Sequence, residues 1–331
     1  MRKRLVVVLF TLFASCGEDA NERSETASKS KELRERAAIE VDRFVDGEAK
    51  ALLRTARKLC APGIGPEERR NHWKRARTHY ERIEGAIAVL FPETDADVDG
   101  RYEHVVELED DRNPFDGVGF IGMHAIERIL WAEEIPEAVF AFERALVHYA
   151  PPQPLVKERE NEFLAGLCAR LIRDLEGMAN ALEGVILDPE TAWRGLLGSI
   201  EEQVEKLRLD GAGQSESRYA RYTLADMRAN LEGGWAVLRA FEPEIGLLPD
   251  GKRRIEALRQ GLRRLEEAYG TISGDALPEP PPHFDPMRPG DDPYGRLYLL
   301  LARESDRFRP GSLAFWIHET GRLLGMKELE R

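Results

Sequence analysis

Helical spacing of apolar residues is the feature that most restricts the fold of this chain. Between about residues 30 and 270, apolar side chains recur every three or four positions within each segment, the interval that places them on one face of a helix. Stretches with proline and glycine separate the segments, as at residues 61–63 and 150–154. The sequence therefore predicts an all-α fold.

Eight helices are expected in this body, and the proline cluster near residue 150 divides them into two sequential four-helix-bundle-like halves, residues 31–150 and 151–270. A proline-rich linker and two more helices then form a short helical C-terminal extension over residues 271–331. The predicted helices span residues 30–60, 66–90, 116–131, 136–149, 155–182, 189–209, 217–241, 252–269, 293–303 and 312–329.

The first 15 residues have the pattern of a bacterial signal peptide and are not expected to belong to the fold. Three basic residues precede the apolar run Leu5–Phe13, and the small residues Ala14 and Ser15 come before Cys16. This setting resembles a lipobox, so we expect lipidation of Cys16, followed by a disordered tether over residues 16–30. The alternative is a plain secretory signal with an incidental cysteine.

The predicted location is the bacterial cell envelope, with a lipid anchor in the membrane and the body facing the periplasm. Gly17, rather than aspartate, follows the cysteine, which resembles the outer-membrane sorting pattern. A formal net charge of −12 argues against nucleic acid as a partner, because phosphate groups would be repelled.

The two remaining cysteines, Cys60 and Cys168, are expected to be separate buried thiols, although an oxidising compartment would allow them to pair. The sequence contains no Cys-x-x-Cys motif. A thiolate-rich zinc or copper(I) site is therefore excluded.

The segment Gly119–Trp131 carries the pattern of greatest functional interest. His124 and Glu127 lie three positions apart within a helical apolar pattern, so they share one helix face and could supply two ligands to one metal ion. The spacing alone is weak, because a second copy occurs at His104 and Glu107. A core histidine beside a surface glutamate is the alternative interpretation.

Several ordered segments resemble the imelysin family, also called the insulin-cleaving metallopeptidase family, which includes periplasmic iron-uptake lipoproteins of the Efe type. The glycine-x-His-x-x-Glu signature of that family matches Gly122–Glu127. The resemblance covers roughly residues 30–245 and implies an all-helical fold built from two bundle-like halves. The other matching segments are Trp73–Glu84, Phe91–Arg101, Ser217–Asp226 and Asn230–Gly233.

Three further carboxylates are candidate ligands. Glu81 and Glu84 repeat the three-residue spacing, and although they could be solvated charges, the family resemblance favours a ligand role for Glu81 in particular. The acidic segment Glu93–Gly100 lacks the final glutamate of an EF-hand, so we interpret it as a helix connection. It either lends Asp99 to the His124 site or has no ligand role.

Carboxylates and one imidazole, without thiolates, suit iron, zinc, manganese or copper(II). The predicted function is therefore that of an imelysin-like metal-binding lipoprotein for iron uptake or delivery, with a membrane permease or receptor as partner. Iron is the expected metal, and zinc and copper are the alternatives. Because ligands must be deprotonated, binding should weaken as the pH falls.

Two other functions stay open. A metallopeptidase of the imelysin type would normally show His-Glu-x-x-His, whereas residue 128 is arginine, so no catalytic residue is assigned. A structural interaction lipoprotein without a metal is the further alternative. Asp226 and Asn230, four apart on a predicted helix, could form a polar site or only fix helix packing.

Overall fold

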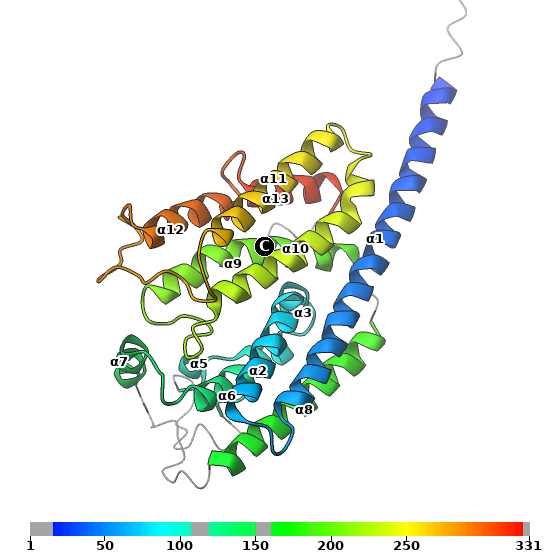
Figure 1. Cartoon of the computed structure of the whole chain (residues 1–331). Coiled ribbons are helices and arrows are strands. Elements are labelled where there is room, and N and C mark those ends of the chain that lie inside the picture. The colour runs from blue at the N-terminus through cyan, green and yellow to red at the C-terminus, as the bar shows by residue number, and fades with distance from the viewer. Residues whose placement is uncertain (1–15, 107–118, 148, 150–159, 186, 327–331) are drawn as a thin grey trace, which may run out of the picture.

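The computed structural model describes residues 16–106, 119–147, 149, 160–185 and 187–326, and it confirms the all-α prediction. These residues form thirteen helices and no strand (Figure 1). The helices are α1 (Cys16–Leu59), α2 (Pro66–Glu81), α3 (Glu84–Leu90), α4 (Pro92–Asp99), α5 (Tyr102–Val106), α6 (Gly122–Leu130), α7 (Glu137–Ala145), α8 (Glu160–Glu183), α9 (Pro189–Asp210), α10 (Thr223–Ile245), α11 (Gly251–Gly270), α12 (Pro293–Glu304) and α13 (Leu313–Leu323).

The long helix α1 runs along one side of the molecule, where it packs against α2, α8, α9 and α10 (Figure 1). It begins at Cys16, so residues 16–30 continue the helix and do not form the disordered tether that their composition predicts. Two sequence features explain the difference. Residues 18–46 contain no glycine or proline, and charged pairs four residues apart, such as Lys31 with Glu35, support the helix.

Helix packing does not follow the predicted division at residue 150. Helix α8, which that boundary assigns to the second half, packs on α1, α4 and α6. Helices α9 to α13 pack among themselves, and α9 and α10 also contact α3, α2 and α1. Residues from distant parts of the sequence therefore meet where α2 and α3 lie against α9 and α10.

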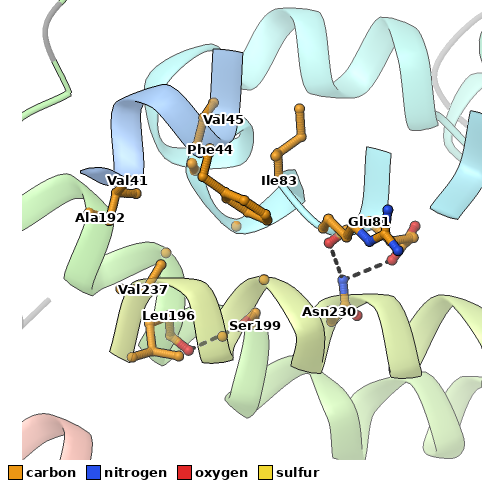
Figure 2. A pocket seen from close by; sticks show the side chains of 16 residues that line it. Val41, Phe44, Val45, Glu81, Ile83, Ala192, Leu196, Ser199, Asn230 and Val237 are labelled. Carbon is orange, nitrogen blue, oxygen red and sulfur yellow. Dashed lines mark hydrogen bonds between the residues drawn. The ribbon is translucent and has the colours of Figure 1, made fainter. Parts of the chain in front are cut away.

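The predicted helix 66–90 is interrupted at residues 82–83, which separate α2 from α3. Gly233 allows the carbonyl group of Arg82 to approach α10, because a side chain at that position would overlap this group. The Asn230 side-chain amide donates a hydrogen bond to the Glu81 carbonyl oxygen at 2.9 Å, which satisfies one carbonyl at the end of α2 (Figure 2). The interruption therefore brings the end of α2 against α10.

Cys60 and Cys168 form a disulfide bond, so the prediction of two separate thiols is wrong. The bond joins the residue after α1 to the middle of α8, and the two Cα atoms lie 5.5 Å apart. Because 108 residues separate the two cysteines, only the packing of α8 against α1 reveals that they meet.

The predicted C-terminal helices correspond to α12 and α13, which pack on α9 and α11. The indole N–H of Trp193 donates to the Ile317 carbonyl oxygen at 2.9 Å, and Arg264 forms an ion pair with buried Glu304 at 2.8 Å. The extension is therefore attached to the body through buried contacts.

None of the helices in the described ranges is both long enough and apolar enough to span a membrane. The predicted signal peptide, residues 1–15, lies outside the described residues.

Candidate functional site

The His124 motif lies on α6, which begins later than predicted, at Gly122. Gly122 has a φ of +80°, and a side chain there would overlap the carbonyl groups of Asp97 and Val98. Only glycine permits this close approach without strain. It brings the start of α6 against the end of α4, which places His124 beside Asp99.

His124 is buried between two carboxylates. Its Nδ1 atom lies 2.7 Å from Glu127 Oε2, and its Nε2 atom lies 3.2 Å from Asp99 Oδ1. The other Glu127 oxygen, Oε1, accepts a hydrogen bond from the Ala220 backbone N–H at 2.7 Å. Glu127 therefore lies behind the imidazole ring, on the side opposite Asp99.

This arrangement selects one state of the ring. Burial lowers the pKa of His124, although the hydrogen bond to Glu127 opposes the change, so the imidazole is neutral near pH 7. The neutral ring carries its proton on Nδ1 and donates it in a hydrogen bond to the Glu127 carboxylate. Nε2 is then unprotonated and has a lone pair. Nε2 is buried and has no hydrogen-bond partner in the part of the chain that the structure describes.

Glu216 completes a group of three possible ligands, and the sequence analysis missed it. Asp99, His124 and Glu216 each offer one ligand atom, and these atoms lie within 4.8 Å of one another. Glu216 belongs to a turn that precedes α10, where Arg221 adopts a φ of +54°. The predicted helix 217–241 therefore begins only at Thr223, and the turn carries Glu216 into the site.

Glu81 and Glu84 form a second group with Asp99 and Glu216, again with ligand atoms within 4.8 Å of one another. The Lys206 ammonium group lies among three of these carboxylates. Its Nζ atom is 2.6 Å from Glu216, 3.2 Å from Glu81 and 3.3 Å from Glu84. The Asn230 amide also donates to both Glu81 and Glu84, at 2.9 and 3.0 Å.

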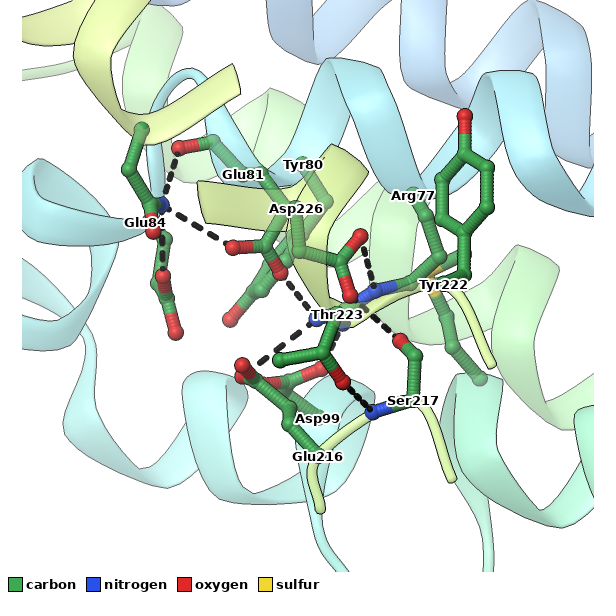
Figure 3. Close-up of polar contacts among 12 residues, drawn as sticks. Arg77, Tyr80, Glu81, Glu84, Asp99, Glu216, Ser217, Tyr222, Thr223 and Asp226 are labelled. Atoms are coloured by element: carbon green, nitrogen blue, oxygen red, sulfur yellow. Dashed lines mark hydrogen bonds and ion pairs between the residues drawn. The ribbon is translucent and has the colours of Figure 1, made fainter. Parts of the chain in front are cut away.

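Arg77 connects the two groups, as Figure 3 shows. Its fully buried guanidinium forms ion pairs with Glu81 and Asp99, and lies 3.4 Å from Glu216 and 3.6 Å from Asp226. Burial acts to lower the pKa of Arg77, but the surrounding carboxylates outweigh it and raise the pKa well above its usual value. Arg77 is therefore a fixed positive charge.

Burial strongly affects the carboxylates as well. It raises the pKa of Glu81 to about 8 and the pKa values of Glu84 and Asp226 to about 7, despite the nearby cations. For Glu216, burial is outweighed by Lys206 and Arg77, which lower the pKa to about 2. Glu216 is therefore ionised at neutral pH, whereas the other three hold protons up to near neutral pH.

A cavity of about 350 Å³ gives access to the cluster. Its lining includes Glu84, Asp99, Lys206 and Glu216 of the cluster and the exposed residues His104, Glu202 and Glu205. Its wall is mainly acidic, which favours entry of cations. His104 belongs to the second copy of the motif, whose Glu107 lies outside the described residues.

A second, smaller cavity of about 30 Å³ lies between α1, α9 and α10 (Figure 2). It is lined mostly by apolar side chains and glycines, with Asn230 and Glu81 at one end. We interpret it as a gap at the helix crossing, because it offers too little space for more than about one or two water molecules.

The structure thus brings together His124, Glu127, Glu81, Glu84 and Asp99, all five residues of the predicted site. Four of them belong to groups with metal-ligand spacing, whereas Glu127 contacts His124 Nδ1, the ring nitrogen on the side away from Asp99. Asp226 and Asn230 contact the same cluster through Arg77 and the two glutamates. The residues that the sequence analysis missed are Glu216, Lys206 and Arg77.

The donor set limits the chemistry. One neutral imidazole nitrogen and several carboxylate oxygens suit borderline or hard cations, including iron, zinc, manganese and copper(II). The orphaned Nε2 atom of His124 points to the same conclusion, because a buried acceptor without a partner is costly and a cation would satisfy it.

Comparisons with known proteins give a consistent picture. Residues 40–277 match the imelysin family. The chain is 27% identical over 200 residues to the iron uptake system component EfeO of Yersinia pseudotuberculosis, which covers 60% of this chain and 40% of that protein. It is 25% identical over 206 residues to the iron uptake system component EfeM of Pseudomonas syringae. That match covers 61% of this chain and 54% of the relative.

A further relative is the iron uptake system component EfeM of Bacillus subtilis, which is 24% identical over 177 residues, covering 53% of this chain and 36% of that protein. The matched part of the chain thus spans between about a third and a half of the length of these relatives. Since the family match covers more than half of the 331 residues, the chain belongs to the imelysin family.

Proposed function

We propose that this protein binds a metal ion, with iron as the natural ion, and serves an iron-uptake system at the bacterial cell envelope. The single observation that carries the proposal is the buried Nε2 atom of His124, which lacks a hydrogen-bond partner in the described chain and has Asp99 and Glu216 within ligand distance. In this proposal the metal ion is the cargo, and the protein holds it for delivery.

Asp99, His124 and Glu216 are the proposed ligands, and Glu127 has a different role from the one that the sequence suggests. Both Glu127 oxygens are occupied, one by His124 Nδ1 and the other by the Ala220 N–H. Glu127 therefore fixes the orientation and tautomer of His124, as carboxylates behind ligating histidines commonly do. Glu81 and Glu84 lie in the adjoining group and contribute negative charge next to the ion once they are deprotonated.

The choice of iron rests on the donor set together with the printed names of the relatives, EfeO and EfeM, which are iron uptake system components. Zinc and copper remain alternative ions. A membrane permease or receptor as partner, and anchoring through a lipid on Cys16, belong to the same proposal. The acidic cavity supports it because a cation can reach the ligands from the surface.

A metallopeptidase is the less favoured alternative. Such an enzyme needs a glutamate that faces the metal-bound water as a general base. Glu127, the glutamate of the motif, faces His124 Nδ1 and a backbone N–H instead. The observed contacts therefore favour metal binding and delivery over hydrolysis.

The test compares His124→Ala with His79→Ala in the full chain. His79 is a matched control, because its Nδ1 atom also lies 2.7 Å from a glutamate, Glu48, but on the partly exposed side of α2. We expect Fe²⁺ affinity, measured anaerobically by titration calorimetry, to fall at least about 100-fold in His124→Ala only. Zn²⁺ and Cu²⁺ titrations identify the preferred ion.

Equal Fe²⁺ binding by the wild type and both variants would contradict the site, and no binding of any of the three ions by the wild type would contradict the function. Incubation of each protein with a protein substrate tests the alternative, since metal-dependent cleavage lost in His124→Ala would favour the peptidase.

A further inference from the structure

Lys206 occupies an unusual position for a lysine. It lies on α9 with only 7% of its side chain exposed, and its ammonium group lies within 3.3 Å of carboxylate oxygens from Glu81, Glu84 and Glu216. These carboxylates come from the end of α2, the start of α3 and the turn before α10. A buried lysine that gathers three carboxylates from separate elements is acting as their common cation.

The same three carboxylates, together with Asp99, have ligand atoms within 4.8 Å of one another, the spacing of a metal site. The ammonium group therefore contacts the oxygens that a second metal ion would need. Two cations that share these oxygens would repel each other strongly in a buried site, because the effective dielectric constant there is low. Lys206 contacts three of the four carboxylates of this group but only Glu216 of the group of Asp99, His124 and Glu216, so it opposes a metal ion mainly in this second group.

Asn230 also holds the Glu81 and Glu84 carboxylates close to each other. The Asn230 amide nitrogen donates to Oε2 of both Glu81 and Glu84, at 2.9 and 3.0 Å, so the two oxygens converge without the help of Lys206. Glu84, Lys206 and Glu216 also line the acidic cavity that reaches the surface. If the ammonium group were absent, Arg77 would still pair with Glu81 and Asp99, but an ion from solvent could reach the Glu84 and Glu216 oxygens that Lys206 now contacts.

We propose that Lys206 fills the second cation position of the cluster and thereby limits it to one metal ion, at Asp99, His124 and Glu216. The identity of that first ion rests on the proposed function, whereas the second position does not, because it involves Glu81 and Glu84 but not His124. Lys206 is thus a residue that determines stoichiometry, and it is not itself a ligand.

The experiment counts bound Mn²⁺, an ion that prefers oxygen ligands, in the full chain and in Lys206→Met. Methionine keeps a long unbranched side chain but removes the positive charge. Mn²⁺ per chain is measured by equilibrium dialysis and by the loss of the free-ion signal in electron paramagnetic resonance, at about pH 8, where protons compete less with the ion than at neutral pH. We expect Lys206→Met to bind one more Mn²⁺ than the wild type.

Three controls make the result specific. Lys206→Arg keeps the positive charge, so its Mn²⁺ number should equal that of the wild type. Lys206→Met with Glu84→Gln should lose the added ion. Lys206→Met with His124→Ala should keep the added ion, so that the gain is visible even if the wild type binds no metal and the proposed function fails.

Lys206→Met should also unfold at a lower temperature than the wild type in the presence of a chelator, and added Mn²⁺ should restore most of the difference. If this variant does not fold, Lys206→Gln, which keeps two N–H donors, takes its place. A folded neutral variant with the same Mn²⁺ number as the wild type would overturn the proposal. So would a gain that Lys206→Arg shares.

Discussion

The buried carboxylates on the two sides of the cluster face different groups. On one side, Lys206 places a covalently attached cation among Glu81, Glu84 and Glu216. On the other side, Asp99 and Glu216 face the neutral Nε2 atom of His124, which has no hydrogen-bond partner among the described residues. Arg77 and Lys206 also contact these two carboxylates, so the property specific to this side is the unpartnered nitrogen, which offers a ligand to an exchangeable cation.

A cluster of buried carboxylates does not by itself define a metal site. Buried charges need compensation, and a lysine or arginine provides it as well as a metal ion does. The property that distinguishes the His124 side is a lone pair held in place by Glu127, since a neutral nitrogen cannot compensate a carboxylate. Arg77 contacts carboxylates on both sides, so it links their stabilities.

Arg77→Met should cost the most stability, because it removes a cation that contacts both sides of the cluster. It leaves Glu81, Asp99 and Asp226 without their shared guanidinium, and removal of one partner from a buried ion pair typically costs about 3–5 kcal/mol. We expect a loss of that size in the free energy of unfolding, measured with urea. Arg57→Gln, which breaks an exposed ion pair with Glu176, should cost less than about 1 kcal/mol.

A loss of less than about 1 kcal/mol for Arg77→Met would mean that the carboxylates are protonated or solvated when the guanidinium is removed. Arg77 would then not link the two sides, because the cluster would tolerate the absence of its central cation.

Glu127→Gln should change only the His124 side. The glutamine can present an N–H to His124 Nδ1, which would shift the ring proton to Nε2 and block the ligand lone pair. We expect Fe²⁺ affinity to fall by about 10- to 100-fold with little change in stability. Titration calorimetry measures the affinity, and urea unfolding measures the stability.

Glu48→Gln is the matched control, because Glu48 makes the same contact with His79 outside the cluster. The Fe²⁺ affinity of the Glu48→Gln variant should match that of the wild type. An unchanged affinity in Glu127→Gln would show that the orientation of His124 does not depend on this carboxylate.

Local patterns account for the part of the molecule that the sequence predicts well. His124 and Glu127 share a helix turn, so their contact follows from helix geometry alone. The all-α fold and most helix positions follow from apolar spacing in the same way. Asp99 was predicted from the family resemblance and an acidic connection, and Gly122 explains its position next to α6 through a backbone contact that spacing cannot reveal.

Long-range packing decides the rest. Glu216 lies in an irregular turn, which also contains Arg221 in a left-handed conformation, and no periodic pattern marks it. Lys206 has the sequence context of an ordinary surface lysine on α9, and only the contact of α9 with α3 surrounds it with carboxylates. The Cys60–Cys168 bond likewise depends on the packing of α1 against α8.

A pH dependence of stability should separate the two sides in the metal-free protein. The folded chain raises the pKa values of Glu81, Glu84 and Asp226 to about 8, 7 and 7, mainly through burial, against about 4 in an unfolded chain. Between these values the folded state binds more protons than the unfolded state, so stability is lost as the pH rises. Glu216 has the opposite sign, but its contribution changes only below about pH 4.5.

With a chelator present, we therefore expect the free energy of unfolding to fall by roughly 1–3 kcal/mol between about pH 5 and pH 8, measured by urea titration. Glu81→Gln should flatten this slope, because glutamine does not ionise while Arg77, Lys206 and Glu84 remain around it.

His124 has a lowered pKa, so the unfolded chain binds its proton more readily, and its contribution to stability rises with pH. His124→Ala should therefore steepen the slope. Equal slopes in both variants would mean that the two sides of the cluster do not titrate separately, and the distinction between them would be lost.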